Sequence, residues 1–374
     1  MKNNKAKLLA AAVAMGMSVQ ASAAIELYNQ DNTTFAVDGL FNAFYTYEDN
    51  SVTNEKQNRV RMGFLPNWIG FNVSKQMDDG LKLGGRSSFW VTINDGHERI
   101  TDTAIDVRQF YGTIDGDFGQ VLIGKDFGIY ARSNIFTDAL LLGTGAPLDF
   151  AVDANGRPSG VTYGNIAIGY PYATPVAQIT YRSPVSNGFQ LAVGVMDPES
   201  GEYTDLNSSQ SARFEAELTY NTEFDGGKLM AWIGGAVGES GSNATLTVPA
   251  TATTAGEDEK GLAFGASVDF GAFKLTASGY DQEGISNIAT GLTTGSSLES
   301  DGYLVQGQYT TGDHRLVASH SSTDVGAADD LFEMNSYAYF YSVNSNLTIV
   351  AQIDNFELGG TDVDQYAIGA VVTY

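Results

Sequence analysis

The sequence lacks cysteine altogether and is poor in proline and in positive charge. Without thiols the chain can form neither a disulfide framework nor a thiolate metal site. Only 20 Lys and Arg stand against 44 Asp and Glu, so the formal net charge is −24, which excludes the basic surface that binds nucleic acid. Beyond residue 23 there is no run of eighteen apolar residues, so we expect no transmembrane helix.

Catalytic and metal-binding patterns are also missing. The three histidines, His97, His314 and His320, do not have the spacing of metal ligands, and the chain has no H-E-x-x-H or G-x-S-x-G motif. One stretch, GGTDVD at 359–364, resembles a calcium-binding repeat, but a single copy is more typical of a turn. We therefore expect no enzyme activity, no metal and no cofactor.

The first 23 residues, MKNNKAKLLAAAVAMGMSVQASA, have the layout of a secretory signal peptide. Three lysines precede an apolar run from Leu8 to Val19, and Ala21 to Ala23 supply the small residues of a signal-peptidase site. The run is shorter than the about 20 residues that a membrane-spanning helix needs. We expect residues 1–23 to be removed. Because they carry three lysines and no acid, the net charge of the mature chain 24–374 is then −27.

What the sequence has in abundance is glycine, at 43 residues, and aromatic residues in a period-two alternation. Tyr, Phe and Thr favour strands, and Gly serves turns and crowded positions. Three segments show this alternation clearly: LKLGGRSSFWVT at 81–92, AIDVRQFYGTI at 104–114 and SARFEAELTYNTEF at 211–224. Their predicted apolar faces are Leu81, Leu83, Phe89 and Val91; Ile105, Val107, Tyr111 and Thr113; and Phe214, Ala216, Leu218 and Tyr220.

The connections between the strands alternate in length. Seven tight turns are predicted at 78–80, 115–117, 183–188, 225–227, 271–272, 311–313 and 342–346. Eight longer polar stretches lie near 49–58, 93–104, 128–165, 197–211, 238–259, 281–299, 323–330 and 357–363. These fifteen connections join sixteen strands, and both chain ends lie on the side of the tight turns.

Closing an even number of strands into a ring removes the unpaired sheet edges that lipid does not tolerate. Short turns on one side, long loops on the other and alternating apolar residues are the signature of an outer-membrane barrel. The alternative, a secreted soluble β-sandwich, would need a packed interior, which does not accept mid-strand arginines and glutamates. We therefore predict an all-β fold: a sixteen-stranded antiparallel transmembrane β-barrel over 24–374, with a long third loop folded into the lumen.

Two strands carry further information. In the second strand the apolar parity changes between Val60–Phe64 and Ile69–Val73, which predicts a bulge or register change near Pro66. The chain ends in DQYAIGAVVTY, whose alternate residues from Tyr366 to Tyr374 form an apolar stripe. We expect this last strand to close the ring by pairing with the first near 35–47, with its stripe facing lipid.

The segment RQFYGTIDGDFGQVLIGKDFG (108–128) resembles the fourth and fifth strands of the general Gram-negative porins, and FAVDGLFNAFYTYEDN (35–50) resembles their first strand. The chain departs from that family in ending with Tyr rather than Phe. It also reads TGAPLDFAVDANGRPSG where many members have Pro-Glu-Phe-Gly-Gly in the third loop. The resemblance implies a trimeric channel for small hydrophilic solutes. It also implies that Tyr374 is part of the signal that the barrel-assembly machinery recognises.

The long connection at about 128–165 is the candidate constriction of such a channel, because a surface loop rarely needs so many apolar residues (Phe136, Leu140, Leu141, Leu142, Leu148 and Phe150). A loop at the trimer contact is the alternative. Its candidate carboxylates are Asp138, Asp149 and Asp153. The resemblance implies an arginine cluster on the facing wall. The matching positions are Arg61, Arg86 and Arg108 on consecutive strands, with Arg59 and Lys82 on the same faces. Ordinary salt bridges within the wall are the alternative role for these bases.

These observations predict a passive outer-membrane channel for ions and small hydrophilic solutes, with a weak cation preference because of the negative net charge. The expected partners are outer-membrane lipid, lipopolysaccharide, two further copies in a homotrimer and the assembly machinery. The alternatives are a substrate-selective channel of the same fold and a barrel that acts mainly as a surface anchor, adhesin or receptor.

Overall fold

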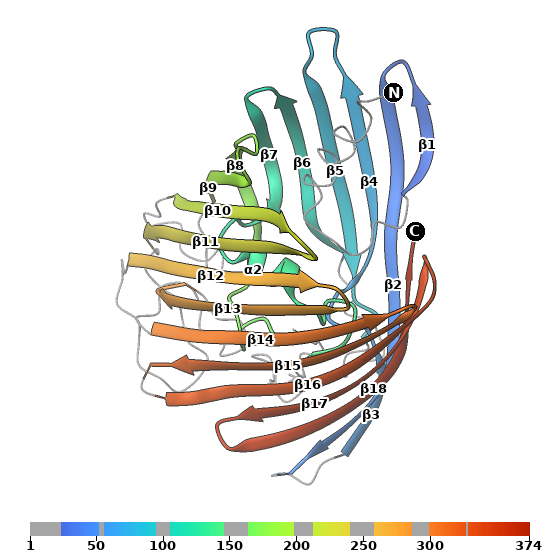
Figure 1. Cartoon of the computed structure of the whole chain (residues 1–374), viewed down its shortest axis with the longest axis vertical. Helices are drawn as coiled ribbons and strands as arrows, with labels where there is room; N and C mark the ends of the chain where they lie inside the picture. Colours follow the sequence, from blue (N-terminus) through green and yellow to red (C-terminus); the bar gives the residue numbers. More distant parts are fainter. Residues whose placement is uncertain are drawn as a thin grey trace.

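The computed structural model describes residues 24–51, 56–94, 105–145, 164–197, 212–239, 258–285, 299–326 and 328–374. These residues form one antiparallel sheet that closes on itself into a barrel (Figure 1). Its first nine strands are β1 Ile25–Gln30, β2 Thr33–Asn50, β3 Lys56–Arg61, β4 Asn67–Gln76, β5 Lys82–Val91, β6 Asp106–Gly116, β7 Gly119–Phe127, β8 Pro175–Arg182 and β9 Phe189–Met196. The others are β10 Arg213–Phe224, β11 Gly227–Glu239, β12 Asp258–Phe270, β13 Phe273–Glu283, β14 Glu299–Thr311, β15 His314–Val325, β16 Ala328–Asn344, β17 Leu347–Leu358 and β18 Thr361–Thr373.

Eighteen strands occupy sixteen positions around the ring. β3 and β4 share one position, because both pair with the same edge of β2. β1 and β18 share another, because β18 pairs with β2 from Asn50 to Leu40 and β1 pairs with β2 from Val37 to Thr33. The barrel is therefore the predicted sixteen-stranded one. The short strand β1 pairs with the part of β2 that lies beyond the end of β18.

The predicted irregularity near Pro66 is confirmed as the gap between β3 and β4. Proline has no N–H to give to the ladder, so a strand is interrupted most easily there. The Asn42 side chain of β2 bonds the interrupted backbone, since its Nδ2 donates to Leu65 O (2.8 Å) and its Oδ1 accepts from Gly63 N (2.6 Å). This break leaves Val60 of β3 and Ile69 and Val73 of β4 on the outer face, whereas Met62 and Phe64 between the two strands are buried.

The seven predicted tight turns are confirmed, and they lie at the end of the barrel that carries both chain ends. Two of the eight long connections are wrong. β15 and β16 are separated by residues 326–327 only, and β17 and β18 by Gly359 and Gly360, whose φ values of 53° and 85° suit a two-residue turn. The polar residues there belong to strands that continue beyond the apolar belt, as the Asn355–Asp364 hydrogen bond of 3.0 Å illustrates.

The alternation of faces is confirmed in most strands. On β10, Phe214 and Leu218 are exposed on the outer face, while the acids Glu215 and Glu217 are buried on the inner face. In a soluble protein the distribution of apolar and charged residues would be the reverse, since apolar residues would fill the interior. The outer apolar belt and the polar inner wall are the arrangement that a barrel in lipid requires.

In the second half of β6 the predicted faces are wrong. Tyr111 pairs in register with Arg86 on the inner wall, whereas its neighbour Phe110 is 63% exposed on the outer face. The cause is a bulge: between the register partners of Ser88 and Trp90, β6 carries one residue more than β5. A one-residue shift moves every following side chain to the other face, and the sequence does not show where it occurs.

The seam between the last strand and the first is confirmed. β18 pairs with β2 along eleven register positions, and Tyr374 exchanges backbone hydrogen bonds with Gly39 at 2.8 and 3.2 Å. The Tyr374 ring stacks on Phe41 with a centroid distance of 5.6 Å. The last residue of the chain is thus part of the ring closure.

Candidate functional site

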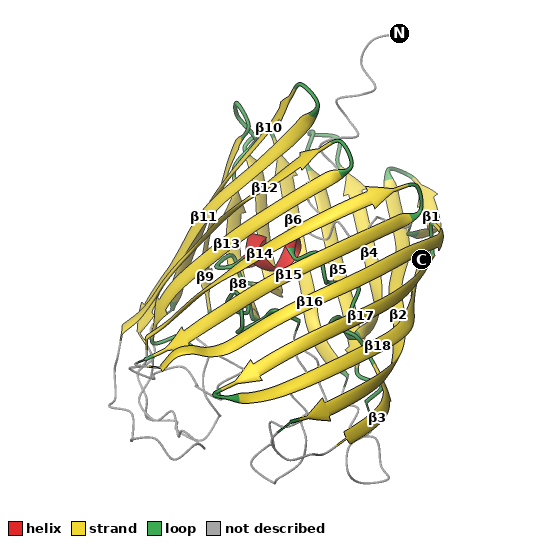
Figure 2. Cartoon of the chain, turned by 60° about the horizontal axis from the view of Figure 1, so that its bottom comes forward, coloured by secondary structure: helices red, strands yellow, loops and turns green. Residues whose placement is uncertain are grey.

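The connection between β7 and β8 lies inside the barrel, as predicted. Its described parts are residues 128–145 and 164–174, and they include the short helix α2 (Arg132–Thr137). Figure 2 shows α2 enclosed by the ring of strands. We call this connection the inner loop. Its position is set by polar bonds to the wall at three places and by apolar packing between them.

The first attachment is made by two carboxylates of β10. Glu215 Oε2 accepts hydrogen bonds from the amides of Ile129 (2.6 Å) and Tyr130 (2.9 Å), and Glu217 Oε2 accepts one from Ser133 (3.2 Å). Ile129 and Tyr130 precede α2, and the Ser133 amide in its first turn has no partner within the helix, so wall carboxylates satisfy all three. This fixes the point at which the inner loop leaves β7.

The second attachment is centred on Asp138, just after α2. Its carboxylate accepts hydrogen bonds from Gln306 Nε2 of β14 (2.7 Å), from Asn165 Nδ2 (2.9 Å) and from the Tyr170 hydroxyl (2.5 Å). Burial raises the pKa of Tyr170 well above its usual value, and the neighbouring Asp138 carboxylate adds to this. Tyr170 therefore stays protonated and donates. Asp138 thus joins the two limbs of the inner loop, residues 128–145 and 164–174, to the wall.

The third attachment is at Thr144. Its amide donates to Gln352 Oε1 of β17 (3.0 Å), and its hydroxyl donates to Asp354 Oδ2 (3.1 Å). Gln365 of β18 donates to the same carboxylate (2.8 Å). On the other side, the amide of Phe64 donates to Gly143 O (2.8 Å). The inner loop thus reaches from β10 to the seam.

Apolar residues of the inner loop fill the space between these attachments. Phe127, the last residue of β7, lies between Trp90 of β5 and Phe136 of α2, and its ring centroid is 6.1 and 5.8 Å from theirs. Leu140 is fully buried in a cluster that includes residues of β2, β4, β5 and β15–β18. The predicted packing of Phe136 and residues 140–142 on the inner wall is confirmed, while Leu148 and Phe150 lie outside the described residues.

Arg86 and Arg108, two of the predicted wall bases, both face the lumen. Arg86 Nη1 contacts Asp38 Oδ2 at 2.5 Å, and its Nε donates to Gln109 (2.8 Å). Arg108 reaches the inner side because of the bulge in β6. Its Nε donates to Asp106 (2.7 Å) and its Nη1 to the Tyr172 hydroxyl of the inner loop (3.2 Å), while its Cζ lies 5.1 Å from the centre of the Trp90 ring.

The other three predicted bases have different surroundings. Arg61 is completely buried and forms an ion pair with Glu48 of β2. Arg59 lies on the same inner face, opposite Thr46, and is half-buried. Lys82 is exposed at the end of β5 that adjoins a tight turn. The five bases therefore share the inner wall of β3, β5 and β6 but do not form one cluster at one height.

The predicted carboxylates are only partly described. Asp149 and Asp153 lie outside the described residues. Asp138 lies against β14, seven strand positions around the ring of sixteen from Arg86, and is only 4% exposed. Its oxygens point to wall and loop donors rather than to the open lumen. The structure thus does not bring Asp138 into contact with the predicted arginines.

Four further lumen arginines were not singled out in the sequence analysis: Arg132, Arg182, Arg213 and Arg315. Arg132 of α2 pairs with Asp126 at 3.2 Å, and Arg213 pairs with Glu215 at 2.8 Å. Strand parity alone would have placed the strand residues among them, because each alternates with exposed apolar residues such as Ile179 and Leu316. Every arginine that the structure describes lies on the inner side.

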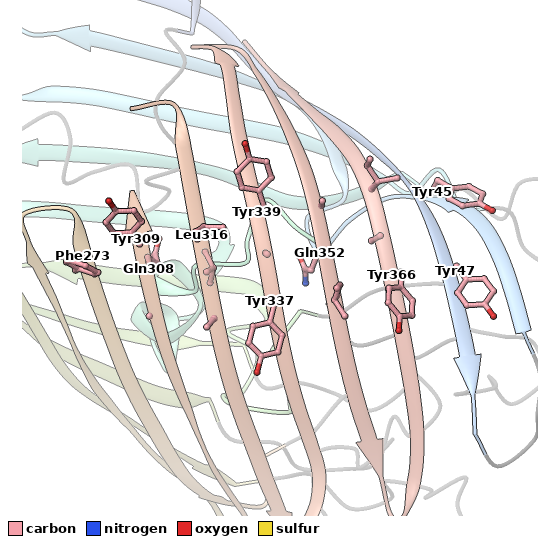
Figure 3. A pocket seen from close by; sticks show the side chains of 18 of the residues that line it. Tyr45, Tyr47, Phe273, Gln308, Tyr309, Leu316, Tyr337, Tyr339, Gln352 and Tyr366 are labelled. Carbon is pink, nitrogen blue, oxygen red and sulfur yellow. The ribbon is translucent and has the colours of Figure 1, made fainter. Parts of the chain in front are cut away.

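The outer wall carries a different kind of feature. A hollow of about 880 Å³ crosses β13–β18 and β2 on the outer face (Figure 3). Large side chains surround small ones at Gly307, Ala318 and Ala351. Its large lining residues are Tyr45, Tyr47, Phe273, Leu275, Tyr309, Leu316, Tyr337, Tyr339, Ile353, Tyr366 and Ile368. The hollow is part of the apolar outer belt.

Among the described residues, no group of three or more His, Asp or Glu side chains is arranged to hold a metal ion. No helix in the same part of the chain is long and apolar enough to cross a membrane.

Comparison with known proteins gives three consistent results. The family model described as Gram-negative porin matches residues 9–361. Outer membrane protein U of Vibrio vulnificus is 31% identical over 135 residues, which is 35% of this chain and only 34% of that protein. Among solved structures, an anion-selective porin from Comamonas acidovorans is similar with a TM-score of 0.69 at 14% identity, covering 91% of this chain and 100% of that one. A trimer form of OmpT from Vibrio cholerae has a TM-score of 0.57 at 16% identity, covering 92% and 100%.

Proposed function

This chain belongs to the Gram-negative porin family, whose members are outer-membrane diffusion channels, and we propose that it forms a passive channel for ions and small hydrophilic solutes. The observation that carries the proposal is the inner wall. Eight described arginines and the carboxylates Asp38, Glu48 and Glu215 face inward, while the outer belt is apolar. Charged walls of this kind suit a water-filled passage, since charges are costly in a dry interior.

The test is conductance in planar lipid bilayers with the purified protein. We expect stepwise current increases on insertion, and reversal potentials in a salt gradient that report the ion preference. A protein that folds and inserts but stays electrically silent would contradict the channel and favour a barrel acting as an anchor, adhesin or receptor.

A weak cation preference is part of the proposal. It is supported by the mature net charge of −27 and by the exposed acid Glu299, at the barrel end opposite the tight turns. Acids at a channel entrance raise the local concentration of cations. A reversal potential of the anionic sign would contradict this part of the proposal and leave the channel itself intact.

We also propose that the inner loop is the constriction, with Arg59, Arg61, Lys82, Arg86, Arg108, Asp138, Asp149 and Asp153 as the charged residues near it. Support comes from the three attachments of the loop and from the position of Arg108 against Tyr172.

Residues 1–23 are proposed to be an export signal that is removed in the periplasm. Proposed partners are outer-membrane lipid, lipopolysaccharide, the assembly machinery and two further copies in a trimer, as in the OmpT form that this chain resembles in fold.

One observation favours the second candidate, a substrate-selective channel. The apolar cluster around Leu140 connects the wall at Trp68 and Trp90 with the wall at Phe340 and Val350, so packed side chains occupy part of the lumen. A narrowed passage discriminates between solutes by size and shape. Swelling of liposomes in a series of sugars separates the two candidates: a smooth decrease of rate with solute size indicates general diffusion, and one outstanding solute indicates selectivity.

A further inference from the structure

Most arginines of the inner wall are neutralised by a neighbouring carboxylate. Five of the eight described arginines form ion pairs within 4 Å, namely Arg61 with Glu48, Arg86 with Asp38, Arg108 with Asp106, Arg132 with Asp126, and Arg213 with Glu215. Arg59 is engaged as well. A paired charge acts on a passing ion mainly as a dipole, whose field falls off faster with distance than that of a single charge. Of the described arginines, Arg182 and Arg315 are the two for which no ion pair is found.

Arg182 is the last residue of β8 and points to the lumen. It shares the inner face with Gln178 and Thr180. Tyr181, between Thr180 and Arg182, is on the outer face, and its hydroxyl donates to Phe118 O. Within the described part of the chain no carboxylate lies within ion-pair distance of its guanidinium, and the residue falls between buried and exposed. A single lumen-facing positive charge is the result.

The acids that act on Arg182 over a longer range are Asp126 and Glu217, and Arg132 opposes them. Both acids have other partners. Asp126 pairs with Arg132 at 3.2 Å and accepts from Gln109 (2.9 Å), and Glu217 accepts from the amide of Ser133 (3.2 Å). Neither carboxylate is therefore directed at Arg182.

Arg315 is the second residue of β15, near the end of the barrel that carries the tight turns. Its Cζ lies 3.9 Å from the centre of the Phe340 ring, and its Nη1 donates to Gln308 Oε1 at 3.4 Å. The acid that acts on it is Asp138, whose oxygens are already bonded to Gln306, Asn165 and Tyr170. Stacking on an aromatic ring leaves the charge of a guanidinium intact.

The two residues lie on opposite walls. β8 and β15 are seven positions apart in a ring of sixteen, so the lumen passes between Arg182 and Arg315. We propose that these two arginines are the fixed positive charges that set the ion selectivity of the channel, and that they provide the transient contact for small anions, including carboxylates and phosphates. They oppose the acidic entrance, which is why the cation preference is only weak.

This inference rests on the proposed channel function, and its test separates the two. Arg182→Gln and Arg315→Gln remove one lumen charge each at nearly constant volume. Lys75→Gln removes the same charge from the outer side of β4, where the exposed Lys75 lies on the same face as Val73, and serves as the matched control. All variants are first checked for heat-modifiable migration, which reports folded barrel.

The measurement is the reversal potential in a salt gradient. A unit charge at several ångströms in water changes the local ion concentration by a factor of about two, so we expect each Gln variant to raise the cation-to-anion permeability ratio about twofold, with Lys75→Gln unchanged. Arg182→Lys and Arg315→Lys should restore the original ratio. Folded, conducting Gln variants with unchanged ratios would overturn the inference. Absence of conductance in the unaltered protein would contradict the proposed function itself.

Discussion

Arg86 of β5 holds Asp38 of β2 across the intervening strand β4, with Nη1 2.5 Å from Oδ2 and Nη2 3.0 Å from Oδ1. Asn72 of β4 lies between them, accepting from Arg86 (2.7 Å) and donating to Asp38 (2.8 Å). Three neighbouring strands are thus joined on the lumen side by one bidentate ion pair. The positive charge of Arg86 is therefore compensated locally by the carboxylate of Asp38.

This pair gives the first prediction. Arg86→Gln should increase cation preference about twofold, because it removes a positive charge and leaves Asp38 unneutralised. The double variant Asp38→Asn with Arg86→Gln removes both charges and should return to the selectivity of the unaltered protein. Reversal potentials measure both. A double variant that retains the shift of the single one would show that Asp38 does not compensate the charge of Arg86.

A second prediction concerns the attachment of the inner loop at Asp138. Asp138→Ala removes the acceptor shared by Gln306, Asn165 and Tyr170, and leaving such buried donors unsatisfied costs about 1–3 kcal/mol each. We expect a lower temperature of heat-induced unfolding on gels and noisier open-channel current, since the loop is less firmly held. Asp225→Ala, at an exposed turn, is the control and should leave both unchanged. A quiet, fully stable Asp138→Ala channel would show that the other attachments suffice.

The fold was largely predictable because strand alternation and turn residues are local signals. The side of each residue followed from parity in β5 and β10, and the tight turns followed from their Gly, Asp and Asn residues. The failure in β6 has the opposite origin. Its bulge is stabilised by the register with β5 and by the contact of Arg108 with Trp90, and neither is visible in residues 104–114 alone.

The candidate site was less predictable, because parity gives the face of a residue and not its partner. The Arg86–Asp38 pair joins residues 48 apart in sequence, and Asp138 meets Gln306 at a separation of 168. Such partners depend on the stagger between strands and on the course of the inner loop. The sequence therefore indicated which residues line the lumen but not which of their charges remain uncompensated. Arg182 and Arg315 were not among the predicted site residues.

A third prediction tests how closely the two limbs of the inner loop approach. A Cβ placed on Gly145 would lie 2.0 Å from the Cα and 2.2 Å from the nitrogen of Gly164, which are backbone atoms that cannot move aside cheaply. Gly145→Ala should therefore force the limbs apart, lower the unfolding temperature and change the unit conductance. Gly307→Ala is the control, because its Cβ would meet only a Leu275 methyl group at 3.6 Å. Equal behaviour of the two variants would contradict the close approach.

The last prediction concerns the end of the chain. Tyr374 contributes two backbone hydrogen bonds to Gly39 and a ring that stacks on Phe41, so it completes the pairing of β18 with β2. Deleting Tyr374 should reduce the fraction of heat-modifiable, folded barrel in the outer membrane, whereas channels that do assemble should show normal unit conductance, because the residue lies at the seam and away from the lumen charges. Tyr374→Phe keeps the ring and the backbone, so it should assemble normally. Tyr374→Ala keeps only the backbone bonds, and its yield separates the contribution of the ring from that of the ladder. Normal assembly of the deletion variant would show that the seam closes without its last residue.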